Sequence, residues 1–212
     1  MNSIKQIEVI YNNRLVGRLA LTREGLCAFE YSAEWLSSGF SISPFELPLR
    51  SGVFIAKPRP FEGGFGVFDD CLPDGWGLLI LDRYLQQKGI NPRTLTLLDR
   101  LALVGSTGRG ALEFRPDNSV VTRQDFADFE KLALEAEKIL ASDDYMGEGI
   151  EEFQDRGGSP GGARPKIFVR YNDKEWLVKF RAKRDSQSIG VDEYRYSLLA
   201  KECGIEMPET RL

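Results

Sequence analysis

The sequence predicts an α+β protein in which a β-rich N-terminal subdomain with packed helices precedes a smaller unit. Three observations carry this prediction. Apolar residues alternate near the N-terminus, helical apolar spacing recurs between residues 75 and 140, and a run rich in glycine and proline precedes two further strand patterns. A chain of 212 residues can form one large core or two small ones. We expect one region over 1–145 and a second over 146–212.

The composition excludes several classes of site. The chain has no histidine, which excludes Ser-His-Asp triads and most zinc sites. Its three cysteines lie far apart and form neither a disulfide framework nor a metal knuckle, as is typical of a reducing cytosol. A formal net charge of −4 disfavours direct binding to nucleic acid. No apolar run is long enough for a leader or a membrane span, so we expect a cytoplasmic protein without a membrane partner.

The first strands are predicted from alternating apolar residues. Alternation occurs over 7–11, further apolar residues follow over 15–19, and the two asparagines between these segments favour a hairpin turn. A third strand is expected over 27–31. The segment 43–49 is expected to be extended, because its two prolines remove hydrogen-bond donors and disfavour helix in the residues before them.

Helices are expected next in the chain. Asp74 is a candidate N-cap for a helix from Gly75 to about Lys88, and the glycine that follows is suited to end it. A short second helix is expected over 94–103. The glycine-rich segment 105–110 lacks a lysine and precedes a strand pattern, so we interpret it as a structural turn instead of a phosphate-binding loop.

The clearest helical pattern begins at a capping box over 122–125. Its apolar face is expected to be core and consists of Phe126, Phe129, Leu132, Ala133, Ala136 and Leu140. Residues 142–149 are polar and acidic, and we expect a linker or domain boundary there.

The segment 156–166 is the strongest local feature of the sequence. It contains four glycines and two prolines, which exclude a helix or a regular strand interior and suit a tight loop whose amides face an anion. The Walker A pattern of a P-loop is absent. Two strands are expected to follow over 166–170 and 175–180, joined by a turn.

Lys179 and Glu193 complete this pattern. Lys179 lies among apolar neighbours in the second strand, and Glu193 lies near the start of a helix expected over 192–203. In protein kinases, a strand lysine neutralises ATP phosphates and a helix glutamate orients that lysine. Each feature also has a simpler explanation: a flexible linker, a lysine that reaches solvent from an edge strand, and a glutamate that favours the helix dipole. Their order favours part of a protein-kinase-like small lobe.

These ordered motifs resemble the HipA family, bacterial serine/threonine kinases that act as toxins of HipBA-type toxin–antitoxin modules. The similarity spans essentially the whole chain and is most specific after residue 157. The motifs that carry it are Ser159-Pro160-Gly161-Gly162-Ala163-Arg164-Pro165-Lys166, Trp176-Leu177-Val178-Lys179 and Val191-Asp192-Glu193-Tyr194, with a looser match at Leu72-Pro73-Asp74.

The resemblance implies roles for individual residues. Ser159 resembles the serine that the family autophosphorylates, and a phosphate there would place negative charge beside the ATP phosphates and disfavour ATP binding. Lys179 resembles the lysine that neutralises these phosphates, and Glu193 resembles its helix partner. Pro165 departs from the family pattern and stiffens the loop. The nucleotide-contacting loop is implied at Gly161, Gly162, Ala163, Arg164, Pro165 and Lys166.

The resemblance also implies a larger protein that uses ATP with Mg. Family members continue into a lobe with the catalytic and magnesium-binding aspartates, so we expect no catalytic residue here and an inactive N-terminal half, either an expressed fragment or a truncated gene product. The implied partners are a helix-turn-helix antitoxin of HipB type, an aminoacyl-tRNA synthetase as a substrate, and DNA only through the antitoxin. Leu198 and Leu199 are expected to be exposed.

Two other interpretations stay open. The main alternative is a non-catalytic interaction or regulatory module that acts on its own in a split HipA-like toxin–antitoxin system. The other is an unrelated β-rich domain with a flexible loop.

Overall fold

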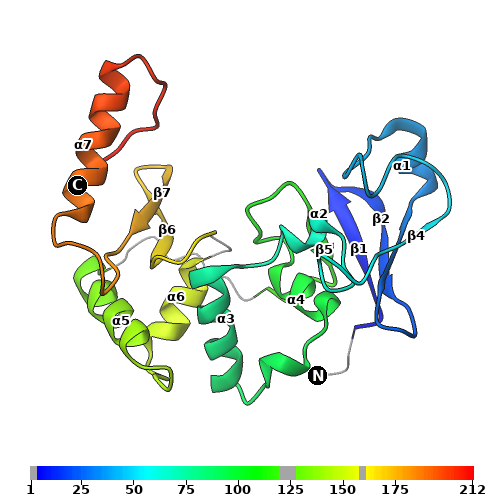
Figure 1. Cartoon of the computed structure of the whole chain (residues 1–212), viewed down its shortest axis with the longest axis horizontal. Helices are drawn as coiled ribbons and strands as arrows, with labels where there is room; N and C mark the ends of the chain where they lie inside the picture. Colours follow the sequence, from blue (N-terminus) through cyan, green and yellow to red (C-terminus); the bar gives the residue numbers. More distant parts are fainter. Residues whose placement is uncertain (1–3, 120–127, 158–160) are drawn as a thin grey trace.

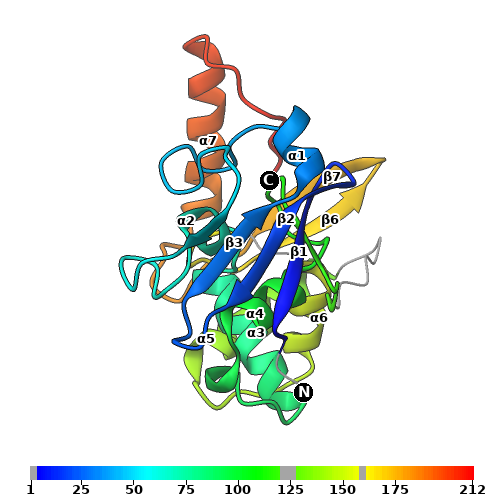
Figure 2. The same ribbon diagram turned by 90° about the vertical axis from the view of Figure 1, so that its right-hand side faces the viewer.

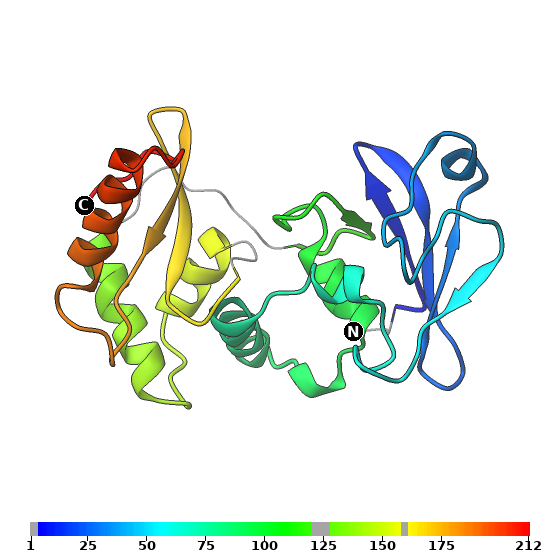
Figure 3. The same ribbon diagram turned by 45° about the horizontal axis from the view of Figure 1, so that its top comes forward.

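The computed structural model describes residues 4–119, 128–157 and 161–212 and has a mixed α/β fold with two hydrophobic cores (Figure 1). One core lies on a five-stranded sheet, and the other lies among helices and a two-stranded sheet. The two sheets lie at opposite ends of the molecule, with helices between them (Figure 3). This arrangement confirms the predicted α+β class. Within the described ranges, no helix is long and apolar enough to cross a membrane.

The five-stranded sheet is entirely antiparallel, in the order β4-β3-β2-β1-β5. Its strands are β1 (Gln6–Tyr11), β2 (Arg14–Leu21), β3 (Cys27–Tyr31), β4 (Val53–Ile55) and β5 (Glu113–Arg115). The predicted hairpin is confirmed, and Asn12 and Asn13 adopt positive φ values of 46° and 61°, which a tight hairpin turn requires. The third strand has the predicted bounds.

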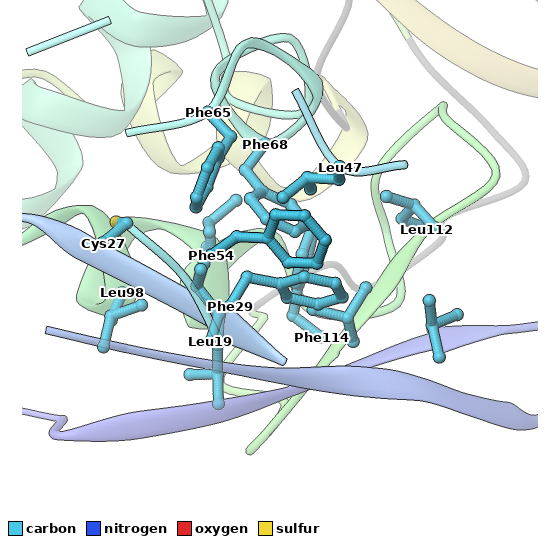
Figure 4. Close-up of a cluster of buried hydrophobic side chains, with 14 of the residues drawn as sticks. Leu19, Cys27, Phe29, Leu47, Phe54, Phe65, Phe68, Leu98, Leu112 and Phe114 are labelled. Atoms are coloured by element: carbon cyan, nitrogen blue, oxygen red, sulfur yellow. The ribbon is translucent and has the colours of Figure 1, made fainter. Parts of the chain in front are cut away.

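Short helices cover one face of this sheet. They are α1 (Ala33–Ser38), α2 (Gly66–Asp69) and α4 (Leu97–Val104), whereas a 3-10 turn (Pro92–Thr94) contacts α3 (Gly75–Gln87). Phe68 of α2 packs between Phe29 and Phe114 of the sheet, with ring centroids 5.5 and 6.4 Å away (Figure 4). Helix α4 lies behind the strands of this sheet in Figure 2, and its Leu98 and Leu101 are buried in the same core. Aromatic side chains from distant segments therefore form this core.

The expected short helix over 94–103 begins later than predicted. Thr96 accepts a hydrogen bond from the Asp99 amide, and the Asp99 carboxylate accepts one from the Thr96 amide, which completes a capping box. This cap fixes the start of α4 at Leu97. The predicted turn over 105–110 is confirmed, because it ends α4 and leads into β5.

The segment 43–49 is not extended as expected. The Leu47 amide donates to the Ser43 carbonyl at 2.7 Å and closes a turn. The Leu47 side chain is fully buried, and its carbonyl accepts a hydrogen bond from the Tyr31 hydroxyl. Burial of this leucine folds the segment back onto the sheet and decides the local structure more strongly than the flanking prolines do.

The second core joins three helices to the two-stranded sheet. Its elements are α3 (Gly75–Gln87), α5 (Phe129–Ala141), α6 (Gly149–Gly157), β6 (Lys166–Tyr171) and β7 (Lys174–Lys179). Arg83 of α3 is buried and donates to the Ile139 carbonyl at 2.7 Å, which ties α3 to α5. The predicted helix after Asp74 is confirmed, and Gly89 has the positive φ expected at its end.

Helix α5 differs from its prediction at the N-terminal end. Asp128 caps it, because its carboxylate accepts a hydrogen bond from the Lys131 amide. The capping box predicted over 122–125 and Phe126 lie outside the described residues. Phe129 is about half exposed (47%) instead of buried. It is the first helical residue and lies beyond the edge of the core that the next turns of α5 contact.

The rest of the predicted elements agree with the structure. Residues 142–149 connect α5 to α6, and the boundary expected between residues 145 and 146 stays a prediction. The last helix, α7 (Ile189–Glu202), begins three residues earlier than expected. Leu198 and Leu199 are exposed on it, as predicted.

Candidate functional site

The β6–β7 hairpin brings two lysines face to face. The strands pair antiparallel, with Lys166 directly opposite Lys179. Like charges at opposite positions destabilise a sheet unless an anionic group lies nearby. Burial, and then the charge of Lys179, lower the pKa of Lys166 from the ordinary lysine value. The hairpin therefore concentrates positive charge at the end of β6 that follows the glycine-rich loop.

Glu193 of α7 supplies the nearest carboxylate to Lys179. The Lys179 amine donates to a Glu193 carboxylate oxygen at 2.8 Å. The guanidinium of Arg164 lies 3.8 Å from the other carboxylate oxygen of Glu193. The structure thus brings together three residues that the sequence analysis singled out. Both Lys179 and Glu193 are partly exposed, so the pair is open to a ligand.

Asp185 is a site residue that the sequence analysis missed. It lies in the connection from β7 to α7 and forms an ion pair with Arg164 at 2.9 Å. The hydrogen bond from the Ala182 amide, and then that from Arg164, lower the pKa of the Asp185 carboxyl. Its sequence context resembles an ordinary polar turn, so no local pattern distinguishes it. Its effect is to direct Arg164 toward β7 and α7.

A hollow of about 320 Å³ lies between β7 and the start of α7. Charged and apolar groups line it together: Arg164, Lys179, Arg181, Asp185, Glu193, Phe180, Ile189, Val191 and Leu212, with Gln187 and Gly190. Of the predicted nucleotide-contacting residues, Arg164, Lys179 and Glu193 line the hollow. The remaining loop residues do not: Gly161, Gly162, Ala163, Pro165 and Lys166. Ser159 lies outside the described residues.

The loop residues lie instead against β6 and α3. Lys166 is buried and its amine donates to the Gly161 carbonyl. The Gly162 amide donates to the Asp74 carboxylate at 2.8 Å, and the Trp76 amide donates to the Gly162 carbonyl at 3.0 Å. The expectation that Asp74 caps α3 is therefore wrong for its side chain, which makes no capping hydrogen bond to the helix and binds the loop instead.

Arg109 connects the N-terminal region to the hairpin. It lies in the glycine-rich turn 105–110, its guanidinium stacks 3.4 Å from the Phe168 ring centroid, and it pairs with Glu175 at 2.6 Å. Phe168 belongs to β6 and Glu175 to β7. The turn thus brings a cation to the hairpin. The contact joins segments that are distant in the sequence, so local patterns could not predict it.

Arg109 and Glu175 are expected to be energetically coupled. In urea unfolding, the double variant Arg109→Ala/Glu175→Ala should lose less stability than the two single variants combined, with a coupling of about 0.5–1 kcal/mol because the pair is partly exposed. Arg109→Lys should keep part of the charge interaction with Glu175 and lose the planar stacking on Phe168. Strictly additive losses would show that the contact does not link the two regions.

The described ranges contain no group of three or more acidic or cysteine side chains that could hold a metal ion. The cations beside the hollow instead match the charge of a phosphate chain. The cations that line the hollow could therefore hold an anion such as a phosphate.

Two family models match the chain. One is described as the HipA N-terminal domain and matches residues 7–115, and the other is described as the HipA-like C-terminal domain and matches residues 158–212. A chain in the solved complex of HipA, HipB and operator DNA, from the toxin–antitoxin system of Shewanella oneidensis MR-1, has the same fold, with a TM-score of 0.60 and 21% identity. That match covers 97% of this chain and 47% of the solved chain, so this chain spans about half of its length. A search of curated proteins finds no match.

Proposed function

Because the chain belongs to the HipA family, we propose that its C-terminal part binds the phosphates of ATP for a serine/threonine kinase of a toxin–antitoxin module. The observation that carries this proposal is the 2.8 Å ion pair between Lys179 and Glu193 beside the hollow. In phosphoryl-transfer kinases, such a strand lysine holds the α- and β-phosphates, and the helix glutamate orients the lysine. Arg164 provides a second cation at the same place.

The electrostatics of the hairpin support a phosphate ligand. Lys166 and Lys179 repel each other from opposite strands, and the charge of Lys179 contributes to the lowered pKa of Lys166. A phosphate chain near both amines would offset this repulsion and stabilise the protonated form of Lys166. ATP, when bound, supplies the phosphoryl group that the kinase transfers. The residues of this chain neutralise and orient its phosphates.

Phosphoryl transfer itself belongs to the complete protein in this proposal. The chain covers 47% of the solved chain, and its described residues contain no group of three or more acidic or cysteine side chains that could hold a metal ion. Catalytic groups and Mg ligands are therefore assigned to the part of a complete kinase that this chain does not cover. Ser159 is proposed as the autophosphorylation site that disfavours ATP binding.

The proposed partners follow from the family and from the solved complex. That complex contains HipA, HipB and operator DNA. We propose that this protein binds a HipB-type helix-turn-helix antitoxin and reaches DNA only through it, which agrees with its net charge of −4. An aminoacyl-tRNA synthetase is proposed as the substrate of the complete kinase.

Calorimetric titration with ATP, ADP and AMP tests the phosphate assignment. The affinity should decrease in that order, because each lost phosphate removes charge-assisted hydrogen bonds to Arg164 or Lys179. Equal affinities for the three nucleotides would contradict recognition through the phosphates. No binding of any of them would overturn the nucleotide assignment and leave the stand-alone interaction module as the interpretation.

A further inference from the structure

The glycine-rich loop is attached to the start of α3 by both peptide groups of one residue. The Gly162 amide donates to the Asp74 carboxylate at 2.8 Å, and the Gly162 carbonyl accepts from the Trp76 amide at 3.0 Å. The two contacts join residues 88 and 86 positions apart in the sequence. They bring the N-terminal part of the chain into direct contact with the loop that the proposed function assigns to ATP.

The close approach depends on Gly75, which lies between the two contact residues. Its φ is +45°, a value that residues with a side chain rarely adopt. A Cβ on Gly75 would lie 2.7 Å from the carbonyl carbon of Gly162 and 2.9 Å from the Cα of Ala163. Such distances are shorter than van der Waals contact, so the loop could not keep its position. The sequence Asp74-Gly75-Trp76 therefore fits the loop backbone closely.

The Asp74 carboxylate serves the loop instead of its own helix. Aspartate at the N-cap position ordinarily accepts a hydrogen bond from the second or third helical amide, which stabilises the helix. Asp74 is at that position and makes no such bond, and its side chain is exposed. Its side-chain contact with Gly162 thus fixes the loop without contributing a cap to α3.

A buried aromatic cluster lies beneath this contact. Trp76 is buried and packs against Phe153, with ring centroids 5.0 Å apart, and Phe153 packs against Phe180 at 5.9 Å. Phe180 directly follows Lys179, so one aromatic cluster underlies both the loop attachment and the lysine. Arg164, two residues after Gly162, lines the hollow that Lys179 lines. Holding Gly162 therefore also limits where Arg164 can lie.

We propose that Asp74 is a positioning residue that holds the glycine-rich loop on α3 and so keeps Arg164 beside Lys179 for the phosphates. The proposal deepens the ATP-binding function and rests on it for the consequence at the nucleotide. Loss of the carboxylate frees the Gly162 amide, the loop moves away from α3, and the phosphates lose one of their cations.

Three variants of the chain test the proposal: Asp74→Ala, Asp74→Asn and, as a control, Asp70→Ala. Asparagine keeps the acceptor oxygen and alanine removes it, and Asp70 is an exposed aspartate four residues earlier. Hydrogen exchange of residues 161–164 is measured without nucleotide, and ATP affinity is measured by calorimetry. In Asp74→Ala, we expect exchange of this segment to rise about tenfold and ATP affinity to fall several-fold. In Asp74→Asn, the exchange rate of this segment and the ATP affinity should both stay close to those of the unmodified chain. Asp70→Ala should change neither the exchange rate nor the affinity.

Other outcomes overturn the proposal. Unchanged exchange in Asp74→Ala would show that the carboxylate does not hold the loop. Faster exchange with unchanged ATP binding would show that the contact does not position the loop for the phosphates. Faster exchange with tighter ATP binding would show that the contact competes with the phosphates. If the unmodified chain binds no ATP, the proposed function fails, while the exchange measurement still decides whether Asp74 holds the loop. The thermal unfolding midpoint should stay constant, since the side chain of Asp74 is exposed.

Discussion

Replacing Lys179 with alanine is expected to weaken ATP binding by about 10- to 100-fold, because in the proposed complex the amine would make charge-assisted hydrogen bonds to the phosphates that each contribute roughly 1.5–3 kcal/mol. The variant also leaves Glu193 without the cation that lies 2.8 Å away, and this carboxylate would then repel the phosphates. The fold should be kept, since Lys179 is about half exposed. Calorimetric titration with ATP measures the effect.

Lys174→Ala is the matched control for this prediction. Lys174 begins the same strand and pairs with Glu209 at 2.9 Å, but it does not line the hollow. Lys174→Ala removes one positive charge, as Lys179→Ala does, and should change ATP affinity by less than about twofold. Similar losses in the two variants would show that general charge, and not the position of Lys179, governs binding.

Replacing Phe153 with alanine is expected to lower the free energy of unfolding by about 3–5 kcal/mol, the typical cost of removing a buried aromatic ring. Phe153 is 1% exposed and contacts the rings of Trp76 and Phe180 edge to face. The lost ring leaves a cavity where α3, α6 and the end of β7 meet. Urea unfolding followed by circular dichroism measures the loss.

Phe129→Ala is the control, and it also tests a correction to the sequence analysis. Phe129 was expected in the core and is about half exposed at the start of α5. Its removal should cost less than about 1 kcal/mol. If Phe153→Ala does not fold, Phe153→Leu can be measured in its place, because leucine keeps most of the buried volume. Its loss of unfolding free energy should lie between those of Phe129→Ala and Phe153→Ala. Equal costs for Phe129→Ala and Phe153→Ala would contradict the placement of the second core.

Local patterns predicted the first three strands of the N-terminal sheet and the strand that follows the turn over 105–110, but not β4. The alternation of Ile7 and Val9 fixes which face of β1 is buried, and the turn residues Asn12 and Asn13 set the hairpin. The β6–β7 hairpin was predicted for the same reason. The pairing of Lys179 with Glu193 also followed from the order of the motifs.

Long-range contacts explain what the sequence did not predict. Asp185 reaches the hollow from a turn, and Arg109 reaches the β6–β7 hairpin from another region of the chain. Neither residue has a local pattern that marks it. Asp74 has the sequence of an ordinary helix cap, but the approach of Gly162 offers its carboxylate another partner. Burial of Leu47 likewise overrides the backbone preference of the prolines beside it. In each case, the deciding partner is distant in the sequence.

The chain passes between its two cores more than once, and this path limits how the protein can be divided. Helix α3 packs in the second core, whereas α2 before it and α4 after it pack in the first. A piece that ends at residue 115 would therefore carry Trp76 and Ile80 with their packing surface uncovered. Both ends of α3 continue into segments that pack in the first core, so melting of either core strains the connections to the other. Heat should therefore disrupt both cores in a single cooperative step.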